Sequence, residues 1–174
     1  MSGECSGAYD GPVVGQCEAE DMTEPEGLIP ELRAWNDGGG VNLLSWLNSV
    51  AQSDVAIGYA ELFWPRFVVF ERYVLRRDFS LENLRGWETA PDINRRDIEW
   101  FVNCLDVGSL FFRGFTEEFA EGADHDLLDQ RVLYIRDVLK ATYTAKLKLD
   151  FPDRAFEVVM IEDEDEIAMT FCQV

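Results

Sequence analysis

The feature that most constrains the fold is the long amphipathic segment at 124–149. Its apolar residues recur three and four positions apart, which is the spacing of one face of an α-helix. Acidic residues lead the segment and lysines close it, so both ends suit the helix macrodipole. The sequence DFPD at 150–153 ends the segment, because a proline cannot continue a helix. We therefore predict one long helix over 126–149, whose apolar face other elements must cover.

Two apolar runs with a period of two residues follow, at 155–161 and 167–174. Alternation of this kind places every second side chain on one face of a strand. Five consecutive acidic residues, Glu162 to Glu166, separate the runs. Two alternating runs around a short polar stretch predict a C-terminal β-hairpin with the acids at its tip. Helix and hairpin together predict an α+β fold, in which a small, mostly antiparallel sheet packs against several helices.

Shorter elements are expected before the long helix. Residues 67–75 are rich in β-branched and aromatic residues on both faces, so they predict one strand that is covered on both sides. Asn42, Ser53 and Ser80 have side chains that cap helix N-termini. Cys104 falls on the apolar stripe of the last of these helices, where we expect a buried and unreactive thiol. The helices are expected at 26–36, 42–51, 53–63, 80–88 and 91–108.

The chain is expected to consist of a tail and one domain. Residues 1–26 are rich in Gly, Ser, Glu and Asp, which predicts a flexible acidic N-terminal tail, and residues 27–174 are expected to form a single α+β domain. No apolar run approaches the ~20 residues of a membrane helix. The N-terminus lacks the basic start and apolar core of a secretory signal, and the four cysteines form no CxxC pair. These features predict a cytoplasmic protein with reduced thiols.

Acidic residues outnumber basic ones by 34 to 15, which gives a net charge of −19. Residues 1–30 contain seven acids and no Lys or Arg, and residues 100–174 contain sixteen acids and seven bases. A field of this sign repels nucleic acids and anionic membranes and attracts basic proteins. The simpler alternative is that the excess of acid only keeps the chain soluble.

The leading hypothesis is a non-catalytic module that uses an acidic surface to bind a basic protein partner. In charge and size the chain resembles small acidic bacterial immunity and inhibitor proteins, which neutralise a cationic toxin, often a nuclease. That resemblance covers charge and size alone, and it implies a basic partner of this kind. The candidate partner-binding residues are the acids of the hairpin tip and of the start of the long helix: Glu117, Glu118, Glu121, Asp124, Asp126, Asp129, Glu162, Asp163, Glu164, Asp165 and Glu166.

The alternative hypothesis is a small-ligand-binding protein or an enzyme. Its pocket would lie near the aromatic segment 59–75 and the only histidine, His125. No catalytic residue, metal ligand or cofactor is assigned, because the sequence has no phosphate-binding loop, nucleophile motif or EF-hand spacing. A third possibility is a subunit of a larger assembly, which requires an exposed apolar patch. The sequence leaves the oligomeric state open.

Overall fold

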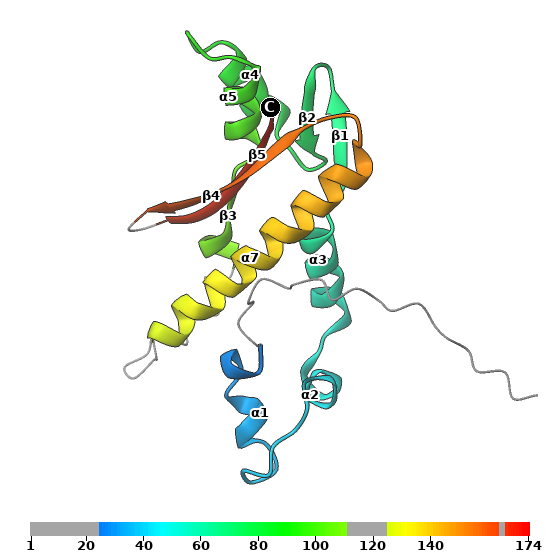
Figure 1. Cartoon of the computed structure of the whole chain (residues 1–174), viewed down its shortest axis with the longest axis vertical. Helices are drawn as coiled ribbons and strands as arrows, with labels where there is room; N and C mark the ends of the chain where they lie inside the picture. Colours follow the sequence, from blue (N-terminus) through cyan, green and yellow to red (C-terminus); the bar gives the residue numbers. More distant parts are fainter. Residues whose placement is uncertain (1–24, 111–124, 164–165) are drawn as a thin grey trace, which may run out of the picture.

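The computed structural model describes residues 25–110, 125–163 and 166–174. It confirms the predicted α+β fold, in which two small antiparallel sheets combine with helices (Figure 1). The tail expected at 1–26 lies outside the described residues, apart from its last two residues, which open the 3-10 helix η1 (Pro25–Leu28).

The predicted C-terminal hairpin forms most of the larger sheet. Strands β4 (Phe156–Asp163) and β5 (Glu166–Gln173) pair antiparallel along their whole length. The two-residue strand β3 (Leu105–Asp106) pairs with the other edge of β5, so the strand order is β3-β5-β4. β5 is therefore the central strand, and all its side chains from Ala168 to Gln173 are buried.

Helix α7 (His125–Asp150) covers one face of this sheet, and its bounds agree with the predicted helix to within one residue at each end (Figure 1). Leu139, Tyr143 and Leu147 lie on its buried face and are at most 1 % exposed. They pack in one cluster with Phe171 of β5, whose ring centroid lies 6.3 Å from that of Tyr143. Burying one leucine side chain stabilises a fold by about 1.5–3 kcal/mol, so this stripe is a major part of the core.

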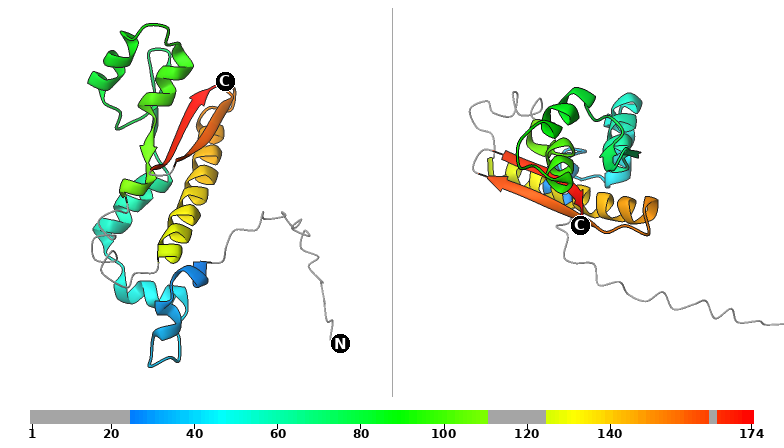
Figure 2. Two further views of the ribbon diagram at one scale, coloured as in Figure 1. Left: turned by 90° about the vertical axis from the view of Figure 1, so that its left-hand side faces the viewer. Right: turned by 90° about the horizontal axis from the view of Figure 1, so that it is seen from above.

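Helix α5 (Arg95–Val102) lies on the opposite face of β5, so the hairpin lies between two helices (Figure 2). Thr170 points to this side because successive side chains of a strand alternate between faces. Its hydroxyl donates a hydrogen bond to the carbonyl oxygen of Trp100 at 2.6 Å. The helix starts with a capping box between Asn94 and Asp97, which satisfies backbone N–H groups that the first turn leaves free.

Residues 67–75 form a hairpin, and the prediction of a single strand there was wrong. Strands β1 (Phe67–Phe70) and β2 (Tyr73–Arg76) pair antiparallel in a two-stranded sheet of their own. Glu71 is in the turn, with a left-handed φ of 54°. The segment lacks the Gly or Asn that normally marks a turn of this kind, so its apolar residues suggested one continuous strand.

Helix α4 (Leu81–Glu88) packs against this second hairpin. Leu84 is completely buried in a cluster with Tyr73 of β2. Ser80 caps the helix as predicted, since its hydroxyl oxygen accepts a hydrogen bond from the backbone N–H of Asn83 at 3.2 Å. The cap fixes the direction in which α4 leaves the hairpin.

The helix predicted at 91–108 is shorter than expected, because α5 ends before Asn103. The side-chain amide of Asn103 donates to the carbonyl oxygens of Val74 at 3.0 Å and of Phe171 at 3.2 Å. These bonds link both sheets and direct the chain into β3 instead of a further helical turn. Cys104 is consequently exposed, so the expectation of a buried thiol was wrong.

The first helices lie at one end of the molecule (Figure 1). The helix predicted at 26–36 is divided into η1 and the short helix α1 (Glu31–Ala34). Pro30 is the N-cap of α1, and it lacks the N–H that a continuous helix would need. The glycine-rich stretch that follows turns the chain, with φ of 89° at Gly38 and 76° at Gly40, where other residues would be strained.

Two further helices complete this end, α2 (Leu43–Val50) and α3 (Ser53–Phe63). Asn42 caps α2 as predicted, by accepting a hydrogen bond from the backbone N–H of Ser45 at 2.9 Å. The predicted cap at Ser53 was wrong, because Ser53 is the first helical residue and the preceding Gln52 forms no side-chain cap.

Candidate protein-binding site

The acidic residues predicted to bind a partner fall in two places in the described part of the chain. Asp126 and Asp129 are exposed near the start of α7. At the hairpin tip Glu162 pairs with Ile167 along the backbone, and Asp163 pairs with Glu166. The remaining candidates lie outside the described residues: Glu117, Glu118, Glu121, Asp124, Glu164 and Asp165.

These two acidic places lie on the same side of the molecule (Figure 1). The chain reverses direction after α7, and β4 then runs back along this helix. The hairpin tip therefore returns toward the start of α7. Acids brought together in this way produce a local negative potential, which attracts basic groups.

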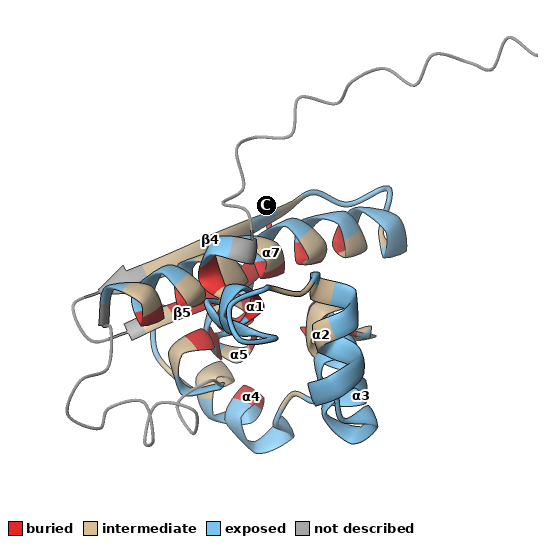
Figure 3. Ribbon diagram, turned by 90° about the horizontal axis from the view of Figure 1, so that it is seen from below, coloured by how far each residue is buried: buried red, intermediate tan, exposed pale blue. Residues whose placement is uncertain are grey.

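Helices α2 and α3 have a property that the sequence did not predict: neither buries a side chain (Figure 3). Leu44 of α2 is 70 % exposed and Ile57 of α3 is 66 % exposed. Among the described residues, Leu62 and Phe63 connect α3 to the core, and both are partly buried. Isolated helices of this length are marginal in water and normally depend on packing, so the exposed apolar side chains of α2 and α3 form a candidate binding surface.

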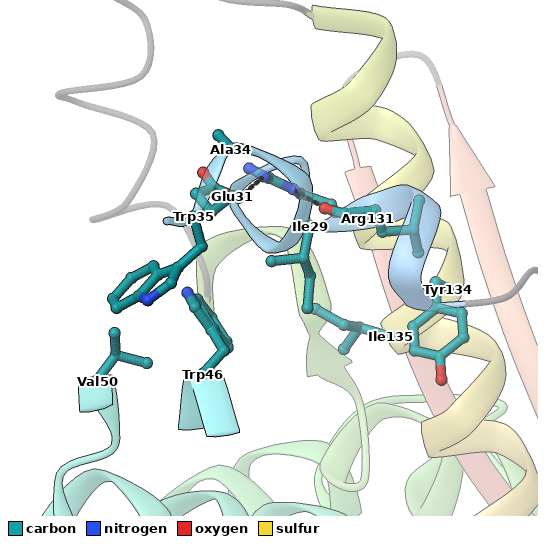
Figure 4. Close-up of a pocket in the computed structure, with 10 residues that line it drawn as sticks. Ile29, Glu31, Ala34, Trp35, Trp46, Val50, Arg131, Tyr134 and Ile135 are labelled. Atoms are coloured by element: carbon teal, nitrogen blue, oxygen red, sulfur yellow. Dashed lines mark hydrogen bonds and ion pairs between the residues drawn. The ribbon is translucent and has the colours of Figure 1, made fainter. Parts of the chain in front are cut away.

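An open groove lies between α1, α2 and α7, with a volume of about 750 Å³ (Figure 4). We call it the apolar groove. Trp35, Trp46 and Val50 line its side toward the N-terminal helices, and Tyr134 and Ile135 of α7 line the facing side. Val50 is 42 % exposed and Trp35 is 36 % exposed, so their apolar atoms are accessible to a bound molecule.

Arg131 is the basic residue of the apolar groove. Its Nε donates to the carbonyl oxygen of Leu28 at 2.8 Å, and its Nη2 lies 3.8 Å from a carboxylate oxygen of Glu31. The side chain thus fastens η1 and α1 to α7 and is partly neutralised there (Figure 4). The floor of the groove is therefore apolar, and the guanidinium of Arg131 already contacts Leu28 and Glu31.

A sequence signal for this groove existed in the helical spacing of Leu43, Leu44, Trp46, Leu47 and Val50. That spacing correctly predicted an amphipathic helix. Periodicity alone assigns an apolar face to the core by default, because it contains no information on which faces other elements cover. The tertiary structure leaves this face open.

The alternative hypothesis combined a pocket near 59–75 with His125. A pocket does border this segment, at Glu61, Leu62, Pro65 and Arg66. Phe67 lies against Tyr143 of α7, with ring centroids 5.7 Å apart. His125 begins the same helix, 18 positions before Tyr143, which corresponds to about 27 Å of helix length. The histidine and the buried aromatic residues of the hairpin are therefore far apart.

Comparisons with protein-family models, with curated proteins and with solved structures give no match for this chain. Within the described ranges, no helix is long and apolar enough to cross a membrane. The same residues contain no group of three or more His, Cys, Asp or Glu side chains arranged to hold a metal ion.

Proposed function

We propose that this chain is a non-catalytic protein-binding module, which docks an amphipathic basic segment of a partner protein in the apolar groove. The observation that carries the proposal is that α2 and α3 bury no side chain although both are rich in large apolar residues. Monomeric proteins rarely leave large contiguous apolar patches in water.

The residues of the groove suit a protein partner. Tryptophan and tyrosine are enriched among the residues that dominate binding energy at interfaces, because they bury much area and keep a polar atom. The groove offers Trp35, Trp46 and Tyr134 together. An amphipathic helix that enters such a groove is recognised through apolar anchors three, four and seven positions apart.

Charge complementarity supports a basic partner. The chain has a net charge of −19, and exposed Asp126 and Asp129 lie on α7 within about three turns of the groove residue Tyr134. Long-range attraction accelerates the encounter, and the apolar contacts then determine how long the complex lasts. An acidic immunity or inhibitor protein that neutralises a basic toxin such as a bacterial nuclease would have these two properties.

The compartment proposed for this module is the cytoplasm. Cys104 lies exposed at the surface, and Cys172 is buried. Exposed thiols remain reduced in the cytoplasm, whereas oxidising compartments favour disulfides.

The test compares two variants that each introduce one aspartate at an exposed apolar residue. Val50→Asp places the charge in the groove, and Leu81→Asp places it on α4, where Leu81 is 51 % exposed and outside the groove. Tagged chains are incubated with lysate of the native host at low salt, and bound proteins are quantified. We expect one basic protein to bind wild type and Leu81→Asp, to be released by high salt, and to be lost with Val50→Asp.

Two results would contradict the proposal. If Val50→Asp and Leu81→Asp retain every captured protein equally, the groove is not the docking site. If light scattering shows that the wild-type chain is a dimer and Val50→Asp a monomer, a second copy of the chain occupies the groove instead of a basic partner.

A further inference from the structure

A second pocket, of about 550 Å³, lies between α3, the open end of the β1–β2 hairpin and the second half of α7. Three arginines line it: Arg66, Arg76 and Arg77. They converge because Phe67 and Arg76 are paired across the hairpin. The next residues outward are Arg66 and Arg77, and the backbone N–H of Arg77 donates to the carbonyl oxygen of Arg66 at 2.8 Å. We call this site the arginine pocket.

The carboxylates near these arginines do not occupy all the N–H donors of the guanidinium groups. Arg66 pairs with Glu61, its Nη2 3.0 Å from Oε2, and Arg76 forms a two-point pair with Asp78 through bonds of 3.0 and 2.5 Å. Among the described residues, none forms an ion pair with Arg77, which is exposed. A guanidinium has more N–H donors than one carboxylate accepts, so all three residues have donors left for a ligand.

Tyr143 adds an independent polar group to the arginine pocket. Its side chain lines the arginine pocket and is only 1 % exposed, yet no described residue bonds to its hydroxyl. All fully buried side-chain oxygen and nitrogen atoms of the described residues have hydrogen-bond partners, so this hydroxyl is not sealed in the core and must open on the pocket. Burial raises its pKa to about 12, which keeps it protonated and able to donate at neutral pH.

We propose that the arginine pocket binds a small organic anion, whose phosphate or carboxylate group is held by Arg76, Arg77 and the Tyr143 hydroxyl. The planar guanidinium matches both oxyanions, since each can accept two parallel N–H bonds. The apolar part of the ligand lies against Leu62, Pro65 and Leu105, which also line the pocket. The volume falls within the ~300–1,000 Å³ typical of small-molecule sites.

Because the chain has a negative net charge, an anion must be bound by direct contacts inside the pocket. A net charge of −19 repels anions at long range, but salt screens exposed charges beyond about 8 Å at physiological ionic strength. Three arginines against two paired carboxylates give the pocket a local excess of positive charge. An anion is therefore held by short hydrogen bonds inside the pocket, and the field of the surface does not guide it there.

The test is isothermal titration calorimetry of the full chain with phenyl phosphate, benzoate, inorganic phosphate and phenol. We expect phenyl phosphate or benzoate to bind more tightly than inorganic phosphate and phenol, because only these two combine an oxyanion with an apolar body. Which of the two binds more tightly decides between a phosphate and a carboxylate ligand.

Variants then assign the binding to the pocket. Arg77→Gln should weaken binding about ten-fold or more, since it removes a charge-assisted bond, and Tyr143→Phe should weaken it a few-fold. The control Arg95→Gln removes the same charge from another exposed arginine, on α5, and should change affinity by less than about two-fold. Equal effects of Arg77→Gln and Arg95→Gln, or no binding of either organic anion at millimolar concentration, would overturn the assignment.

Discussion

The carboxylate of Glu99 accepts a hydrogen bond from the backbone N–H of Val74 at 2.8 Å, which joins α5 to strand β2. The second carboxylate oxygen accepts from the backbone N–H of Gln173 in β5 at 2.7 Å. Glu99 has no exposed surface. One buried side chain thus connects the small hairpin with the three-stranded sheet, and the two sheets have no strand in common.

Replacing Glu99 by Ala should lower the free energy of unfolding by about 3–5 kcal/mol. The change leaves two buried backbone donors without an acceptor, and each unsatisfied buried donor costs about 1–3 kcal/mol. Urea denaturation measures the effect. The control Glu82→Ala alters an exposed residue of α4 and should stay within about 0.5 kcal/mol of wild type. A similar small effect of Glu99→Ala would show that packing and the Asn103 bonds hold the two sheets together without Glu99.

Replacing Arg131 by Met should release η1 and α1 from α7. Methionine keeps an unbranched apolar stem but loses the bond to the Leu28 carbonyl and the contact with Glu31. We expect faster amide hydrogen exchange at 28–35 and little change in β4 and β5, because local opening requires less free energy than global unfolding. The control Arg33→Met alters an exposed arginine of α1. Unchanged exchange at 28–35 would mean that apolar contacts alone fix this end.

Replacing Tyr143 by Phe should make the chain more resistant to alkali. Burial raises the pKa of Tyr143 from 10.0 to about 12, so the folded state binds this proton more tightly than the unfolded state. The resulting stability is complete below pH ~10 and is lost as the pH rises through about 12. Between these limits wild type should lose about 2–3 kcal/mol more than Tyr143→Phe in urea unfolding. Parallel pH curves for the two proteins would contradict the raised pKa.

Replacing Arg85 by Gln should flatten the acid end of the stability curve. Arg85 donates to Glu88 at 2.6 Å and to Glu71 at 3.2 Å, and these bonds lower the pKa of both carboxyls. A lowered pKa in the folded state gives stability that is present above about pH 4.5 and is lost as the pH falls further. Thermal midpoints from pH 7 to pH 3 should therefore fall less in Arg85→Gln than in Arg95→Gln. The same acid response in both variants would rule out this contribution.

Reversing the charge of the hairpin tip should slow the association with a basic partner. In the variant, lysines replace Glu162, Glu164 and Glu166, and the association rate is measured by stopped flow over a range of salt concentrations. We expect a lower rate with a flatter salt dependence, because the local attraction is removed. The control places lysines at three acids outside the tip, Glu82, Asp92 and Asp153. If the tip variant and the control slow association equally, the net charge of the chain accelerates association and the hairpin tip has no specific role.

Elements with a strong local pattern were predictable from the sequence. The long helix, the C-terminal hairpin and the caps at Asn42 and Ser80 agree with prediction, because each depends on side chains that are neighbours in the chain. The turn at Glu71 was missed, since its position has a left-handed φ without the residues that favour it, and Arg85 of α4 supplies a contact from outside the hairpin.

The candidate sites likewise combine features that the sequence determined with features that depend on tertiary contacts. The sequence by itself determined the negative charge, the amphipathic helices and the acids of the hairpin tip, because these follow from composition and spacing. Only the tertiary structure decided that α2 stays uncovered, that Arg66 and Arg77 meet at the open end of a hairpin, and that His125 is far from Tyr143. The physical reason is that exposure and convergence depend on contacts between residues distant in the chain, which local periodicity does not contain.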